Sequence, residues 1–130
     1  MGLFTSFNGK NKSQNENDSL PWIDLKDISQ LDSVESNSFD KPQFIFKHST
    51  RCGVSRIVLQ MFKKEYGLSE EEADLYFLDI IQNRHTSNKI AEKFDVRHES
   101  PQLLIISDGK VIAHKSHGEI NDIKAVDYVN

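Results

Sequence analysis

The stretch QFIFKHSTRCGVSRIVLQMF (residues 43–62) joins a strand pattern to a helix pattern and so decides the fold. Its continuous apolar run, Phe44 to Phe46, is typical of a strand that is covered on both faces, as parallel sheets require. Apolar residues then recur at i, i+3, i+4, i+7 and i+8, which predicts an amphipathic helix with a buried apolar face. These residues are Val54, Ile57, Val58, Met61 and Phe62. Gly67 can end the helix in a left-handed conformation.

Strand and helix patterns alternate on both sides of this unit. Before it, PWIDL (residues 21–25) predicts a short strand, and DISQLDSVESNS (residues 27–38) predicts a helix. After it, LYFLDII (residues 75–81) predicts a third strand, and TSNKIAEKF (residues 86–94) predicts another helix. The polar residues expected to cap these two helices are Asp27 or Ser29 and Thr86 or Ser87.

The last third of the chain contains a hairpin pattern. SPQLLIISDGKVIAHK (residues 100–115) has two apolar runs joined by Asp108-Gly109, a dipeptide that strongly favours a two-residue turn. Asn121 is then expected to cap a closing helix that carries Ile123 and Val126. The predicted order is therefore βαβαβαββα, an α/β fold of the thioredoxin-like kind, in which helices flank a mixed central sheet.

The size and charge of the chain limit its organisation and partners. With 130 residues it can form one domain with its own core, and we expect residues 20–130 to do so. Residues 1–19 are mostly polar, so we expect a flexible leader there. The net charge of −4 argues against nucleic-acid binding. A single cysteine, together with the absence of a signal-peptide or membrane-spanning pattern, predicts a cytoplasmic protein.

Cys52 is expected to lie at the carboxyl end of the central strand, where α/β folds place their sites. It also begins the following helix, so its sulfur would face free backbone N–H groups of the first turn. These groups, together with the cations Lys47, Arg51 and Arg56, are expected to favour the thiolate over the thiol. The sequence therefore indicates a reactive cysteine, although a lone cysteine is also common as an inert core residue.

Ser55 stands three residues after Cys52, where a dithiol oxidoreductase would have its second cysteine. Without that thiol, a mixed disulfide on Cys52 must persist until an outside thiol attacks it. The predicted chemistry is therefore monothiol. The Ser55 hydroxyl can donate a hydrogen bond toward the sulfur, or it can serve only as a polar residue of the first helical turn.

Pro101 directly precedes the first strand of the hairpin. In thioredoxin-like folds, a cis-proline at this place packs beside the active sulfur. Because Pro101 occurs together with Cys52 in the expected order, we predict that the Ser100-Pro101 bond is cis, although most X-Pro bonds are trans.

Several segments resemble the monothiol bacilliredoxins, thioredoxin-like proteins of the bacillithiol system, over residues 22 to about 129. They are HSTRCGVS (residues 48–55), VRHESPQ (96–102), DGK (108–110) and HKSHGEI (114–120). The resemblance implies removal of bacillithiol from S-bacillithiolated proteins, with bacillithiol as co-substrate and with bacillithiol or another reductant restoring the enzyme. By position, Cys52 would attack, Ser55 would occupy the place of the absent resolving thiol, and Pro101 would be the cis-proline.

Other residues are expected to contact the bacillithiol that Cys52 carries. By position these are Arg51, Gly53, Val54 and Ser100. Bacillithiol is a cysteinyl-glucosaminyl-malate, so its carboxylates need positive partners, and Arg56 and Arg97 are further candidates. No metal is expected, because one cysteine and scattered histidines do not form a zinc-ligand pattern. The histidines nearest to the predicted site are His48, His98, His114 and His117.

Two other functions remain open from the sequence. CGVS (residues 52–55) is similar to the CGFS signature of monothiol glutaredoxins that carry an iron–sulfur cluster, with the cysteine as ligand. Against this reading, the third residue is Val54 rather than an aromatic residue, and no Gly-Gly-x-Asp segment follows the hairpin. The fold could also serve only as a protein-binding module. We expect a monomer.

Overall fold

The structure is a computed structural model that describes residues 20–129 of the chain. The predicted leader, residues 1–19, lies outside this range. In chain order, the elements are β1 (Trp22–Asp24), α1 (Gln30–Asn37), β2 (Gln43–His48), α2 (Gly53–Glu65), β3 (Asp74–Asp79), α3 (Arg84–Phe94), β4 (Gln102–Ser107) and β5 (Lys110–Ser116), followed by the 3₁₀ helices η2 (His117–Asp122) and η3 (Ala125–Tyr128).

The five strands form one mixed sheet in the order β1-β3-β2-β4-β5. β1 and β2 both pair with β3 in parallel, whereas β4 runs antiparallel to β2 and to β5. β2 is therefore the central strand, and all six of its residues are buried. The thioredoxin-like α/β class and the doubly covered central strand predicted from the sequence are confirmed.

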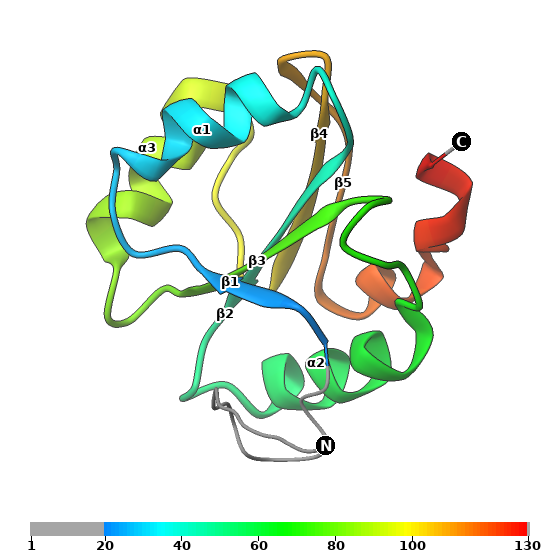
Figure 1. Ribbon diagram of the computed structural model, residues 1–130. Coiled ribbons are helices and arrows are strands. Elements are labelled where there is room, and N and C mark those ends of the chain that lie inside the picture. Colours follow the sequence, from blue (N-terminus) through cyan, green and yellow to red (C-terminus); the bar gives the residue numbers. More distant parts are fainter. Residues whose placement is uncertain (1–19, 130) are drawn as a thin grey trace, which may run out of the picture.

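The helices cover the sheet in two layers. α1 and α3 lie together on one face, whereas α2 and the two C-terminal 3₁₀ helices lie on the other (Figure 1). Because side chains alternate along a strand, β2 supplies Phe44 and Phe46 to the α2 face and Ile45 to the opposite face. Each face thus has its own apolar core.

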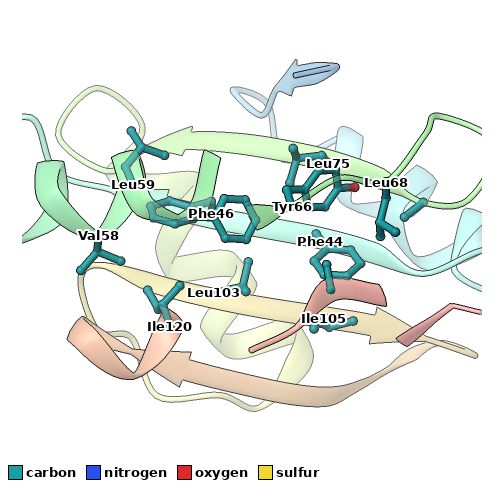
Figure 2. Close-up of a cluster of buried hydrophobic side chains, with 13 residues drawn as sticks. Phe44, Phe46, Val58, Leu59, Tyr66, Leu68, Leu75, Leu103, Ile105 and Ile120 are labelled. Carbon is teal, nitrogen blue, oxygen red and sulfur yellow. The ribbon is translucent and has the colours of Figure 1, made fainter. Parts of the chain in front are cut away.

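The core under α2 contains aromatic rings in contact (Figure 2). Phe46 and Phe62 have ring centroids 5.2 Å apart, and Phe44 lies edge-on to Tyr66 at 5.5 Å. Leu103 and Ile105 of β4 complete the sheet side of this core. The packing ties α2 to the central strand, so the start of α2 has a defined position at the sheet edge.

The buried face of α2 differs from the predicted one. Val58 and Phe62 are buried as expected, but Val54, Ile57 and Met61 are 52%, 65% and 48% exposed. The buried positions are instead Ser55, Val58, Leu59 and Phe62, which also follow a helical spacing. The helix is rotated in this way because the Ser55 hydroxyl has hydrogen-bond partners inside the protein.

The predicted caps are confirmed only in part. Ser29 occupies the N-cap of α1 but makes no capping side-chain bond, whereas Oδ1 of Asp27 accepts from the Ser29 N–H at 3.2 Å. Gln30 Oε1 accepts from the backbone N–H groups of Lys26 and Asp27. α3 begins at Arg84, so the predicted caps of that helix lie inside it. The Thr86 hydroxyl donates to the Lys26 carbonyl at 2.9 Å, so its polar group joins two segments.

The end of the chain also differs from prediction. In place of a closing α-helix, residues 117–128 form η2 and η3. Asn121 lies inside η2 and donates through its side chain to the Val58 carbonyl at 3.3 Å, so it attaches η2 to α2 instead of capping a helix. Ile123 packs against the core beneath α2, whereas Val126 is 63% exposed.

The predicted hairpin turn is confirmed. Asp108 and Gly109 have φ angles of 53° and 82°, as a two-residue turn with two left-handed residues requires. The ring of Phe39 covers Gly109 so closely that a Cβ built there would lie 2.8 Å from a ring carbon. Within residues 20–129, no helix is long and apolar enough to cross a membrane.

Candidate active site

Cys52 is the N-cap residue of α2 and follows the carboxyl end of β2 after three residues. Its backbone is extended, with φ −110° and ψ 119°. The Cys52 N–H donates to the Ser49 carbonyl at 3.2 Å, and the Cys52 carbonyl accepts from the Arg56 N–H at 3.2 Å. The side chain is partly exposed and makes no capping hydrogen bond among the described residues. The thiol is therefore held at a fixed backbone position and remains accessible to a partner.

Ser55 is completely buried in the first turn of α2. Its oxygen accepts from the Ser49 N–H at 3.1 Å and lies 2.7 Å from Nδ1 of His48. Burial lowers the pKa of His48, so its ring is neutral, and the tautomer of the ring sets whether the Ser55 hydroxyl donates to Nδ1 or accepts from it. Both of these partners lie inside the protein. Among the described residues, no hydrogen bond joins the Ser55 hydroxyl to the sulfur of Cys52, which was one of the two roles that the sequence left open for Ser55.

His48 ends the central strand and links the site to β3. Its ring lies 5.5 Å from the ring of Phe77. After burial, the largest influence on the pKa of His48 is the carboxylate of Asp79, which raises it, whereas Lys63 and Arg56 lower it. The His48–Ser55 pair was not predicted, although the sequence contains its signal: a histidine at a strand end and a serine in the first turn of the next helix.

The Ser100-Pro101 peptide bond is cis, as predicted. Pro101 precedes β4, whose first residue, Gln102, is paired with Lys47 near the carboxyl end of β2. Pro101 and Cys52 therefore lie at the same edge of the sheet. The backbone N–H of His117 donates to the Pro101 carbonyl at 3.0 Å and fixes the start of β4. The hydroxyl of Ser100 is buried and has no hydrogen-bond partner within residues 20–129.

The predicted cations take different positions. Arg56 folds back over the cysteine loop and donates from its guanidinium to the Thr50 carbonyl at 3.2 Å. Arg51, next to Cys52, is exposed, and Arg97 is exposed in the segment before Pro101. Gly53 and Val54 are also exposed, so the first turn of α2 presents its outer side to solvent.

Lys47 was expected among the cations near the thiol, and the structure contradicts this. Its side chain is completely buried on the α3 side of the sheet. The ammonium donates to the Ser87 carbonyl and to Nδ1 of His98, both at 3.3 Å. Burial lowers the pKa of Lys47 to about 8. The expectation failed because strand alternation directs Lys47 to the face opposite to Ser55.

His98 has a structural role in this second cluster. Its Nδ1 lies 3.2 Å from the Ser87 hydroxyl as well as near Lys47. Burial and the positive charges of Lys47 and Arg84 lower the pKa of His98, so the ring is neutral and accepts hydrogen bonds. Within residues 20–129, no three His, Cys, Asp or Glu side chains gather into a group that could hold a metal ion.

Residues 23–124 match the model of the family described as Monothiol bacilliredoxin BrxC. Among solved structures, the chain is similar to a candidate oxidoreductase with a thioredoxin fold, at 33% identity and a TM-score of 0.67, with 82% of this chain and 91% of that chain covered. It is also similar to a reduced Schistosoma mansoni thioredoxin preprotein, at 20% identity and a TM-score of 0.62, with 84% of this chain and 99% of that chain covered. Thioredoxin O2 from Arabidopsis thaliana is 22% identical with a TM-score of 0.59, and the match covers 82% of this chain and 90% of that chain.

The two thioredoxins share the fold with this chain, but identities of 20% and 22% do not show which substrates it uses. The family match and the more similar neighbour go further, because both concern redox proteins of the thioredoxin type. With the accessible thiol of Cys52 at the start of α2, they identify the chemistry of this site as thiol-disulfide oxidoreduction.

Proposed function

The chain belongs to the monothiol bacilliredoxin family, and from this premise we propose that it removes bacillithiol from S-bacillithiolated proteins. The substrate is a client protein whose cysteine is joined to bacillithiol by a disulfide. Cys52 is the nucleophile that takes bacillithiol from the client. The co-substrate is free bacillithiol, or another thiol, which restores Cys52.

In the first step, the Cys52 thiolate attacks the bacillithiol sulfur of the mixed disulfide. A new S–S bond forms between Cys52 and bacillithiol, the old S–S bond breaks, and the electron pair leaves on the client sulfur, which then takes a proton from solvent. Attack on this sulfur requires a thiol at the protein surface, and Cys52 is partly exposed.

In the second step, an outside thiolate attacks the bacillithiol sulfur that Cys52 carries. When the attacking thiol is bacillithiol, the products are Cys52 thiolate and bacillithiol disulfide, so one disulfide is exchanged for another and no further oxidant is needed. The chain has no second cysteine that could perform this step internally.

The observation that supports this proposal best is the contrast between positions 52 and 55. Cys52 presents a partly exposed thiol, whereas the residue one turn later is a buried serine with two internal hydrogen bonds. Such a site can accept and pass on one thiol group but cannot close an internal disulfide.

Intact-mass analysis tests the proposal. Reduced protein is incubated with an S-bacillithiolated client, beside an S-glutathionylated client and a Cys52→Ala control. We expect bacillithiol to leave the client and appear on Cys52 faster than glutathione does, with no transfer to the control. If the client keeps its bacillithiol while the protein remains folded, the proposed function is wrong.

A further inference from the structure

A groove lies beside the site at the carboxyl ends of β1 and β3. It consists of two depressions of about 410 and 250 Å³ that share Asp24 and Phe77 in their walls. The larger continues to Asp79 and the turn before α3, and the smaller continues to Leu59 on α2. We call the two together the β1 groove. Its combined size is typical of small-molecule sites.

The β1 groove does not include Cys52 in its walls, but close contacts connect the two. Phe77 packs against the ring of His48 at 5.5 Å, and His48 is bonded to Ser55 one turn after Cys52. Leu59, at the α2 wall of the groove, follows Cys52 by seven residues, about 10 Å along the helix. That distance is about the length of three extended residues. A ligand of tripeptide size bonded to the Cys52 sulfur can therefore reach the groove along α2.

The groove combines aromatic surface with polar groups. Trp22 and Phe77 meet at right angles, with ring centroids 5.4 Å apart and an interplanar angle of 78°, so they form an apolar corner. Such a corner suits the C–H face of a sugar ring, whose hydroxyl groups then point to polar neighbours. The amide side chains of Gln82 and Asn83 at the rim can bond hydroxyl groups.

The charges of the groove are mixed. Lys26 and Lys63 contribute positive charge, and Asp24 and Asp79 contribute negative charge. Oδ1 of Asp79 already accepts from two backbone N–H groups of the following turn, which fixes the carboxylate in the wall of the groove. A ligand that carries carboxylates together with hydroxyl and amide N–H donors complements this arrangement better than a simple anion does.

We propose that the β1 groove binds the glucosaminyl-malate part of bacillithiol while its sulfur is bonded to Cys52. The proposal rests on the function proposed above. Lys26 and Lys63 pair with the malyl carboxylates, the aromatic corner supports the sugar ring, and Asp24 and Asp79 accept from hydroxyl and amide N–H groups. The groove thus explains how a thiol exchanger could distinguish bacillithiol from smaller thiols.

Exchange rates test this assignment. Lys63→Gln and Asp79→Asn are compared with the unmodified protein on two clients, one S-bacillithiolated and one carrying a mixed disulfide with mercaptoethanol, which has neither sugar nor charge. We expect each variant to slow the transfer of bacillithiol about fivefold, as the loss of one charge-assisted contact predicts. The same variants should slow the transfer of mercaptoethanol less than about twofold. Lys64→Gln, an exposed change on the same helix, is the control and should leave both rates unchanged.

A binding experiment locates the ligand directly. Isotope-labelled Cys52→Ser protein is titrated with S-methyl bacillithiol while backbone amide signals are followed by NMR. Shifts centred on residues 22–26 and 77–83 support the groove. Shifts confined to residues 97–101 overturn it, as do equal rates for all variants when the unmodified protein transfers bacillithiol normally. If the unmodified protein transfers mercaptoethanol but not bacillithiol, the proposed function itself fails, and the groove assignment fails with it.

Discussion

Replacing the buried Lys47 by methionine should stabilise the protein at neutral pH. Lys47 is completely buried, and within residues 20–129 its charge has only one carbonyl and one neutral ring as hydrogen-bond partners. Methionine has a similar length and no charge, so it can fill the same space. The Ser87 hydroxyl remains as a partner for His98 in the variant, so the ring is not left without a hydrogen bond.

The magnitude follows from the lowered pKa. A change from 10.5 to about 8 corresponds to about 3 kcal/mol of burial penalty on the charged form. Below pH 8, Lys47 is charged in the folded and unfolded states, so the wild-type protein bears the full penalty. Between pH 8 and 10.5, the unfolded state binds more protons than the folded state, so the free energy of unfolding rises with pH. Allowing for the lost hydrogen bonds, Lys47→Met should gain about 1–3 kcal/mol at pH 7.

Urea unfolding at pH 7, 8, 9 and 10 measures this difference, with fluorescence of the single tryptophan as the signal. The advantage of Lys47→Met should be greatest at pH 7 and shrink toward pH 10, because the wild-type amine is then neutral. Lys64→Met, at an exposed position of α2, is the matched control and should show no such trend. A variant less stable than wild type at pH 7, or an advantage independent of pH, would refute the reasoning.

Four further substitutions test other parts of the structure. Gly109→Ala should lower the free energy of unfolding by about 1–3 kcal/mol in urea titrations, because it adds a Cβ at positive φ against Phe39; unchanged stability would contradict the turn geometry. Ser55→Ala should lower the free energy of unfolding by about 1–3 kcal/mol in the same assay, because the buried His48 ring and the partly buried Ser49 N–H lose their bond; full stability would argue against that network. Ser55→Cys should yield an internal disulfide with Cys52 in place of a persistent adduct, which intact-mass analysis detects as a loss of two hydrogens. Arg51→Ala should slow transfer from bacillithiol-modified clients about fivefold more than transfer from uncharged disulfides, because it removes a positive charge that attracts the carboxylates as bacillithiol approaches Cys52; equal slowing in stopped-flow assays would exclude this role.

The parts of the fold that the sequence predicted correctly are those set by local patterns. The apolar run of β2 marks a doubly covered strand, Asp108-Gly109 marks a turn with two left-handed residues, and Cys52 stands where strand pattern changes to helix pattern. Each of these signals depends on a few adjacent residues. The order of elements and the place of the thiol follow from such signals, without knowledge of long-range contacts.

The failed predictions depend on contacts between particular polar groups, at short and at long range in the sequence. The helical spacing of α2 allows more than one buried face, and the choice that buries Ser55 and exposes Ile57 is made by the bond to His48. Lysine is usually a surface residue, so a sequence pattern assigns Lys47 to solvent. Its burial requires the carbonyl of Ser87, forty residues later. Composition and periodicity do not show such pairs, because a polar residue is assigned to solvent unless its partner is known.

The monothiol character of the site is therefore more than the lack of a second cysteine. The Ser55 oxygen accepts from the Ser49 N–H, and the Ser49 carbonyl accepts from the Cys52 N–H, so the residue in place of a resolving thiol orders the loop that carries the reactive one. A cysteine at position 55 would weaken this support, since sulfur is a poor hydrogen-bond acceptor. The chain also has no second cysteine that could attack an adduct on Cys52. Release of the adduct must then depend on a thiol from solution, and the rate of that step should follow the concentration of the thiol.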